Sequence, residues 1–96
     1  MTRVKGIDFD WDQWNVQKNE TKHGVSALEA ESAFYDSRYR LFEDVKHSRA
    51  REKRYILYGR SSENRVLMVA FTVRQRRLRV ITARPASRRE RRLYGE

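Results

Sequence analysis

Arginine side chains stand in or directly after short apolar runs that the sequence predicts to be β-strands. The three that matter most are Arg60, Arg79 and Arg84. A guanidinium group stays charged at neutral pH and can bind two phosphate oxygens at once, while a strand fixes its backbone. We therefore expect Arg60 and Arg84 to clamp a phosphate group, with Arg79 in support. The alternative is that they are exposed strand arginines, or ion-pair partners of Glu52 and Glu90.

Four further side chains, Lys22, His23, His47 and Glu52, have the chemistry for proton transfer or phosphate contact. Proton transfer beside a phosphate needs a base and an acid, and cations stabilise extra negative charge on the phosphate. The two histidines titrate near neutrality, and the dipole of a predicted helix favours protonated His23 at its C-terminus. Each also has a plain structural alternative: a helix C-cap for His23, an idle surface group for His47, a partner of Arg54 for Glu52 and a surface lysine for Lys22.

The sequence offers a poor ligand set for a metal ion. Its two histidines are 24 residues apart, no carboxylates cluster with them, and there is no cysteine. Zinc sites use groups of Cys, His and carboxylate ligands. We therefore expect neither a metal nor any other cofactor.

The positive charge is concentrated in the second half of the chain. Residues 1–50 carry eight Lys/Arg and nine Asp/Glu, whereas residues 51–96 carry fourteen and four, within a net charge of +9. Segregated basic charge points to a polyanion, nucleic acid first. The alternatives are a basic surface that only keeps the protein soluble, and one that binds an acidic protein.

The length of 96 residues fits one domain, residues 1–96. No run approaches the roughly 20 apolar residues of a membrane span, and the N-terminus lacks the apolar segment of a signal peptide. The absence of cysteine suits a reducing compartment. We expect a cytoplasmic protein with no membrane contact.

A β-hairpin is predicted over residues 66–84. An apolar run at 66–73 and a mixed run at 78–84 flank a basic turn, and Pro85 closes the second run. The first run is apolar on both faces and should be a central strand. Simple alternation puts Arg79 and Arg84 on opposite faces of the second run.

The remaining segments predict helices on one face of this sheet. Strands are expected at 7–11, 39–42 and 53–59. Asp12 caps a helix over 13–23 that should pack through Trp11 and Trp14, and capping boxes at Ser26 and Ser87 begin two more helices. The prediction is an α+β domain whose antiparallel sheet has four to five strands, with two N-terminal helices packed on it and a short C-terminal helix.

Four sequence pieces, in order, resemble the BrnT toxin family over about Phe9 to Tyr94. They are Asp10-Trp11-Asp12 with Asn19 and Lys22-His23-Gly24-Val25; then His47, Glu52 and Arg54; then Tyr58-Gly59-Arg60-Ser61; and finally the run from Arg79 to Arg91. The chain departs from the family pattern at Asn15 and Pro85, where lysine is usual. The loss of lysine at position 15 removes one cation from the first helix.

The resemblance implies a RelE-like fold and a ribonuclease toxin that inhibits translation. It also implies a BrnA-like antitoxin partner, an RNA substrate, and contact with operator DNA only through the toxin–antitoxin complex. On this reading the arginines of the hairpin tip and the last helix contact the RNA backbone or the antitoxin: Arg74, Arg76, Arg77, Arg88 and Arg89. The alternative function is a non-catalytic nucleic-acid-binding or protein-interaction module.

Overall fold

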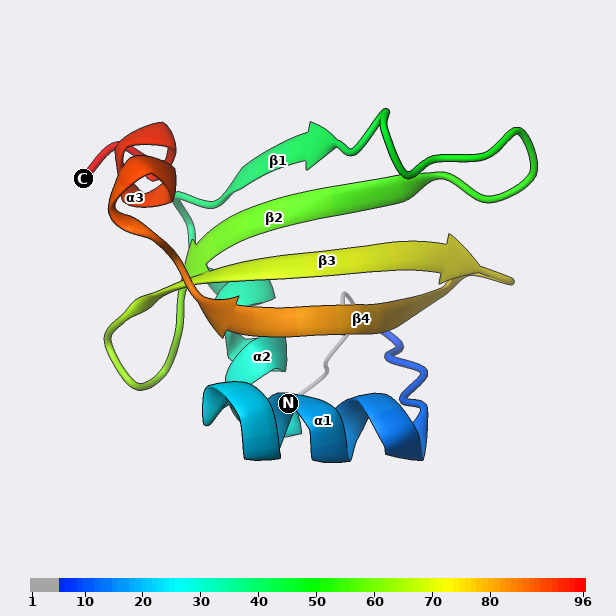
Figure 1. Cartoon of the computed structure of the whole chain (residues 1–96), viewed down its shortest axis with the longest axis horizontal. Helices are drawn as coiled ribbons and strands as arrows, with labels where there is room; N and C mark the ends of the chain where they lie inside the picture. Colours follow the sequence, from blue (N-terminus) through cyan, green and yellow to red (C-terminus); the bar gives the residue numbers. More distant parts are fainter. Residues whose placement is uncertain (1–5) are drawn as a thin grey trace.

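Four antiparallel strands form one sheet in the order β1-β2-β3-β4 in the computed structural model, which describes residues 6–96 (Figure 1). The strands are β1 (Arg40–Glu43), β2 (Arg54–Arg60), β3 (Val66–Arg74) and β4 (Arg77–Pro85). The helices are α1 (Gln13–His23), α2 (Ala27–Ser32) with the 3-10 turn Ala33–Tyr35, and α3 (Arg88–Tyr94). The predicted α+β class is confirmed, with four strands.

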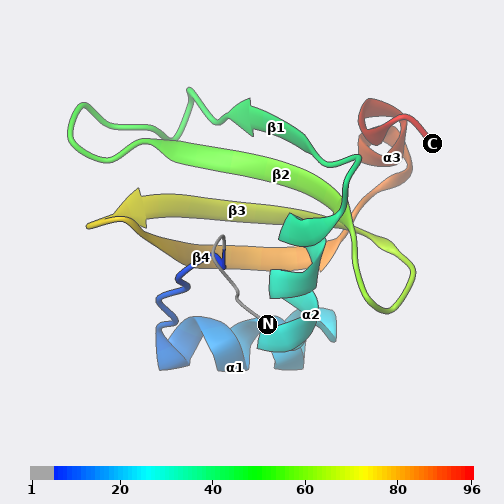
Figure 2. The same ribbon diagram turned by 180° about the vertical axis from the view of Figure 1, so that it is seen from behind.

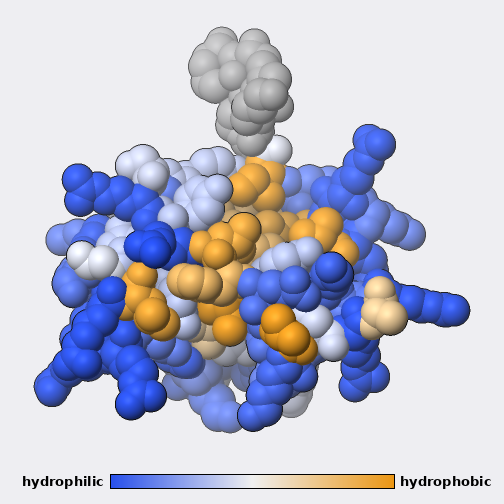
Figure 3. All heavy atoms as spheres, turned by 90° about the horizontal axis from the view of Figure 1, so that it is seen from above, coloured by the Kyte–Doolittle hydropathy of each residue, from blue (hydrophilic) through white to orange (hydrophobic). Residues whose placement is uncertain are grey.

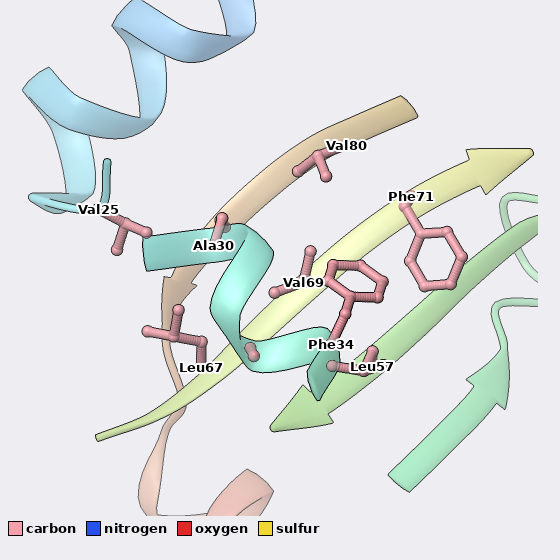
Figure 4. Packing of buried hydrophobic residues seen from close by; sticks show 10 residues of the cluster. Val25, Ala30, Phe34, Leu57, Leu67, Val69, Phe71 and Val80 are labelled. Carbon is pink, nitrogen blue, oxygen red and sulfur yellow. The ribbon is translucent and has the colours of Figure 1, made fainter. Parts of the chain in front are cut away.

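The main core lies between the sheet and α2. Figure 4 shows side chains of β2, β3 and β4 converging on α2 and the 3-10 turn, and Figure 2 shows α2 in front of the sheet. Phe34 packs edge-to-face on Phe9 and Phe71, with ring centroids 5.2 Å apart in each pair. Gly59 lets the 3-10 turn approach, because a Cβ at this position would lie 2.4 Å from the Ala33 carbonyl oxygen. These contacts fix α2 on one face only.

The opposite face of the sheet carries a smaller apolar cluster: Tyr58, Val66, Met68, Ala70 and Ala86, with Ile56 and Tyr94 beside them. This face looks toward the reader in Figure 1, and of the helices in residues 6–96 only α3 lies on that side, at the end of the sheet where β2 and β4 finish. The space beyond α3 is left open. We call this surface the open face.

Helix α1 attaches to the edge strand β4 through polar side chains. The Asn19 side chain, 2% exposed, accepts the Ala83 N–H at 3.2 Å. Lys18 Nζ donates to the Ile81 carbonyl at 3.1 Å, and Asn15 Nδ2 donates to that of Val80 at 3.4 Å. An edge strand has unpaired backbone groups, and α1 pairs some of those of β4.

The prediction that Trp14 packs in the core is wrong. Trp14 is 72% exposed, because α1 turns its Asn15–Asn19 side toward β4. Trp11 is half-buried, packs against the core, and donates its Nε1–H to Glu31 Oε2 at 2.6 Å. The N-cap at Asp12 is confirmed by its bond from the Trp14 N–H, and the left-handed Gly24 ends the helix.

A register shift in the β3–β4 ladder changes the predicted faces of β4. Thr82 lies opposite Ala70 and Val80 opposite Phe71, so Ile81 is the extra residue of a β-bulge. Arg79 and Arg84 therefore lie opposite Thr72 and Met68, which share one face of β3. The two arginines are on the same face, where simple alternation had separated them.

The other predicted helices and strands are present, with smaller changes. Residues 7–11 make only an isolated bridge, Phe9 to Leu78, instead of a full strand. At α2, the Ser26 side chain accepts a hydrogen bond from the Glu29 N–H, which is one half of the predicted capping box. The Glu29 side chain bonds to Arg65 instead of the Ser26 N–H, so the other half is not formed. The capping box at Ser87 is complete.

Strand β1 is the exposed edge of the sheet on the side away from β4. Its four residues are all exposed and include the apolar Leu41 and Phe42. Figure 3 looks down on this edge and shows apolar side chains in a strip between hydrophilic ones. No helix in the described part of the chain is long and apolar enough to cross a bilayer.

Candidate active site

One row of cross-strand neighbours on the open face brings together chemistry from separate segments. Arg40 pairs with Tyr58, Tyr58 with Met68, and Met68 with Arg84, so the four side chains leave the sheet on the same side. Two strand spacings put the Cα atoms of Tyr58 and Arg84 about 10 Å apart. Long side chains at these positions can reach a common ligand.

Arg84 is held by the first turn of α3. Its Nη1–H and Nη2–H donate to the two carboxylate oxygens of Glu90, each at 2.8 Å, and a second Nη1–H donates to the Pro85 carbonyl at 3.2 Å. The bond from Arg84 is the main reason that the pKa of Glu90 lies below its usual value. The guanidinium is thereby fixed while its side chain stays 33% exposed.

These bonds occupy the far end of the guanidinium, and no other residue within 6–96 bonds to its side. Three of the five N–H donors are used. The remaining two, Nε–H and the second Nη2–H, are adjacent and parallel, which is the edge that grips a phosphate or carboxylate through two bonds. Arg84 is thus positioned by one carboxylate and open to a second anion.

In three other arginines, the Nε and Nη2 donors that form this edge are already paired with a carboxylate. Nε and Nη2 of Arg65 donate to Glu29, those of Arg74 donate to Glu52, and those of Arg79 lie 3.4 and 3.3 Å from Asp10 Oδ2. Arg65 in particular is tied to a carboxylate that is 5% exposed and also accepts the Ser61 hydroxyl. In each of these three arginines a carboxylate of the protein occupies the edge, and this contrast distinguishes Arg84.

Arg60 lies at the other end of α3. It donates to Glu96 and sits over the Tyr94 ring, 5.8 Å from the ring centroid. The Tyr94 hydroxyl donates to Asp36 at 2.6 Å, and these residues line a cleft of about 380 Å³. Arg84 does not line this cleft. Arg60 and Arg84 share the open face, but different carboxylates hold them: Glu90 within α3 pairs with Arg84, and Glu96 after α3 pairs with Arg60.

His23 and Lys22 lie at the C-terminus of α1, beside the end of β4. Burial lowers the pKa of His23 below its usual value of 6.5, and the positive charges of Lys22, Arg84 and Lys18 lower it further. The expected rise in pKa from the helix dipole is therefore outweighed. His23 is mainly neutral at pH 7, the form in which imidazole can accept a proton.

Glu52 and Arg79 lie at the opposite end of the sheet from Arg84. Glu52 is paired with Arg74, and Arg79 with Asp10. Arg79 and Arg84 lie opposite Thr72 and Met68, which are four residues apart on β3, or roughly 13 Å. The structure therefore separates the six residues predicted for catalysis into groups instead of gathering them in one pocket.

The remaining predicted RNA contacts are on the surface. Arg74, Arg76 and Arg77 surround the β3–β4 turn, where Gln75 and Arg76 have positive φ angles of 53° and 65°. Arg88 and Arg89 are exposed on α3. His47 is bonded to Asp44 in the β1–β2 loop.

Tyr58 is a candidate that the sequence did not reveal. It is 6% exposed, and its ring packs on Phe42 with centroids 5.8 Å apart. Burial raises its pKa above the usual value of 10.0, and the negative charge of Glu90 raises it further. The phenol is protonated at neutral pH and can donate a proton. Only the strand register places it beside Arg84, and no local pattern encodes that register.

In the part of the chain that the structure describes, no three His, Asp or Glu side chains are grouped as metal ligands. The Asn19 Nδ2 atom, on the α1 side of β4, is buried with no partner among those residues.

Comparisons with known proteins identify the relatives of this chain. A family model described as "Ribonuclease toxin, BrnT, of type II toxin-antitoxin system" matches residues 11–90. The fold is similar to the crystal structure of the Brucella abortus ribonuclease toxin BrnT, with a TM-score of 0.62 and 24% identity, over 86% of this chain and 100% of that one. No curated protein matches the sequence.

Proposed function

The chain belongs to the BrnT family of ribonuclease toxins of type II toxin–antitoxin systems, and from that premise we propose that it cleaves RNA without a metal ion on the open face, around Arg84. A toxin of this class has an antitoxin partner. The observation that carries the proposal is the guanidinium of Arg84, which Glu90 fixes while its two-donor edge bonds to none of the residues that the structure describes. A phosphodiester is the RNA group that this edge recognises.

The proposed reaction is an internal transfer. A base removes the 2′-OH proton, the 2′ oxygen attacks the adjacent phosphorus, and the 5′ oxygen leaves with a proton from an acid. The products are a 2′,3′-cyclic phosphate and a 5′-hydroxyl. Arg84 stabilises the charge that accumulates on the non-bridging oxygens.

The protonation states favour His23 as the base and Tyr58 as the acid. The lowered pKa of His23 keeps its imidazole neutral, and the raised pKa of Tyr58 keeps its phenol protonated. Lys22 is positioned to contact a neighbouring phosphate. This assignment deepens the sequence prediction at His23 and Lys22, and it adds Tyr58.

The other predicted residues have roles away from the scissile phosphate in this proposal. Arg60 contacts the RNA strand at the α3 end. Arg79, paired with Asp10, and Glu52, paired with Arg74, order the charged surface at the opposite end. The exposed arginines contact further phosphates: Arg74, Arg76, Arg77, Arg88 and Arg89. Binding through such contacts weakens steeply with added salt.

The biological consequence follows from the same chemistry. RNA cleavage inhibits translation, and a BrnA-like antitoxin neutralises the toxin by covering its basic surface. Contact with operator DNA is made only through that complex.

Purified protein incubated with RNA in excess EDTA tests the proposal. We expect cleavage in EDTA, a loss of about 100- to 1000-fold in Arg84→Ala, and a smaller loss in Arg84→Lys, which keeps the charge but not the two-donor edge. Arg49→Ala, an exposed loop arginine, is the matched control. Tight binding of intact RNA would instead favour the non-catalytic nucleic-acid-binding function, and cleavage abolished by EDTA would contradict metal independence.

A further inference from the structure

Trp14 is exposed on the outer side of α1, and the packing of the protein does not require it. Its side chain is 72% exposed, whereas α1 attaches to β4 through Asn15, Lys18 and Asn19. A single exposed apolar residue is ordinary on a protein surface. Trp14 differs because it borders a hollow that is also lined by Lys18 and Lys22.

The ring of Trp14 borders a hollow of about 430 Å³ along α1. The wall is mostly apolar and consists of Trp14, Gln17, Lys18, Thr21 and Lys22. It contains two cations and no carboxylate. Positions 14, 18 and 22 follow each other at four-residue intervals, so they lie on one side of the helix and span about 12 Å.

The cations of this hollow continue toward the proposed cleavage site. Lys22 is followed by His23, and the charge of Arg84 is near enough to lower the pKa of His23. In Figure 1, α1 runs beside β4, the strand that carries Arg84 on the open face. A strand of RNA with a phosphate at Arg84 can therefore cross the edge of β4 and reach α1.

An aromatic ring beside spaced cations is the pattern by which proteins bind single-stranded nucleic acids. The bases stack on the ring and the phosphates contact the lysines, with little dependence on base identity. We infer that Trp14, Lys18 and Lys22 form a stacking subsite for a nucleobase of single-stranded RNA, a few nucleotides from the bond that is cut. The inference rests on the proposed function, because the position of the scissile phosphate defines where the subsite begins.

Two features favour RNA over a protein segment in this hollow. Its charged side chains are all positive, and its cationic line leads to the proposed phosphate site instead of ending at an apolar boundary. Leu28 of α2 is another exposed apolar side chain; it is 78% exposed and does not line the hollow. Leu28 therefore serves as a matched control.

Binding is measured with a fluorescently labelled, ten-nucleotide 2′-O-methyl RNA in EDTA, because blocking the 2′-OH prevents cleavage. A lost stacking contact should weaken binding about 5- to 100-fold in Trp14→Ala. Trp14→Leu should bind as weakly as Trp14→Ala, and Trp14→Phe should stay close to wild type, since only phenylalanine keeps a ring for stacking. Leu28→Ala should bind like wild type. Thermal unfolding verifies that each variant is folded.

Tryptophan emission gives a second, direct readout. Adding the unlabelled 2′-O-methyl RNA should quench the wild-type emission, and Trp14→Phe, which retains only Trp11, should lose that quenching. Equal RNA affinity of Trp14→Ala and Leu28→Ala would overturn the inference. So would full binding by Trp14→Leu, or a Trp14→Ala variant that binds RNA normally but no longer binds its antitoxin, which would assign the hollow to a protein.

The two proposals fail separately. If the wild type cuts unmodified RNA, Arg84→Ala does not, and Trp14→Ala binds RNA as tightly as the wild type, only the subsite is overturned. Protein that leaves unmodified RNA intact while RNA still quenches Trp14 overturns the cleavage proposal and leaves Trp14 as an RNA contact.

Discussion

Replacing Glu90 by alanine should reduce RNA cleavage even though it removes a negative charge from a site that binds an anion. Glu90 holds the Arg84 guanidinium through two bonds of 2.8 Å. Without them the side chain regains its rotational freedom, and misplacement of a catalytic group by about 1 Å can lower the rate roughly 100-fold. Because the charge on Arg84 remains, we expect kcat/KM to fall by about 10- to 100-fold, less than in Arg84→Ala.

The same change also affects stability, and the two effects must be separated. Arg84 and Glu90 are 33% and 18% exposed, so their ion pair contributes about 1 kcal/mol, and the half of the capping box that Glu90 makes with the Ser87 N–H contributes at most about 1 kcal/mol more. For a domain of this size the midpoint of thermal unfolding should fall by roughly 5–15 °C. Ser87→Ala is the control, because it weakens the same helix cap and leaves Arg84 paired.

Cleavage of a fluorogenic RNA, measured well below the unfolding midpoint, tests the positioning role. If Glu90 acts only through Arg84, the double variant Arg84→Ala/Glu90→Ala should be no slower than Arg84→Ala alone. Additive losses would show that Glu90 has a separate role. An increase in cleavage or RNA affinity in Glu90→Ala would refute the reasoning, because Glu90 would then be a competitor of the substrate.

Three further outcomes follow from the described contacts. Asn19→Ala should lower the free energy of unfolding by about 1–3 kcal/mol in urea denaturation, because the buried Ala83 N–H loses its acceptor; a change below 0.5 kcal/mol would mean that water replaces Asn19. The bond from Arg65 lowers the pKa of Glu29 in the folded protein below its usual value of 4.5. The contribution of ionised Glu29 to stability is therefore complete above pH 4.5, and it is lost as the pH falls through the pKa of the folded state. Wild type should therefore lose more stability in acid than Glu29→Gln, and parallel pH profiles would contradict the pairing. NMR titration, with His47→Gln to assign the signals, should give His23 a pKa below 6.5, and the acid limb of the cleavage profile should coincide with it; a limb at a different pH would remove His23 as the base.

Local sequence patterns were sufficient to predict the elements of this fold. The apolar run at 66–73 and its basic turn specify the central hairpin, and Ser87 with Glu90 specifies the start of α3. These features are encoded within a few consecutive residues, so no tertiary information is needed to find them.

The sequence does not predict the features that depend on contacts between distant segments. The bulge at Ile81 brings Arg79 and Arg84 to one face, and a strict two-residue period cannot anticipate it. The apolar character of Trp14 predicts a core residue, whereas α1 packs through Asn19 on the edge of β4. No local pattern points to Tyr58, because its place two strand spacings from Arg84 is set by the register of three strands.

The chemical nature of the RNA ends tests the central claim most directly. Mass spectrometry of the products made in EDTA should find a 2′,3′-cyclic phosphate on one fragment and a 5′-hydroxyl on the other, since the proposed attack comes from the neighbouring 2′ oxygen. An otherwise identical 2′-O-methyl RNA should remain intact. Fragments with a 5′-phosphate and a 3′-hydroxyl, or cleavage of the 2′-O-methyl RNA, would contradict the proposed mechanism.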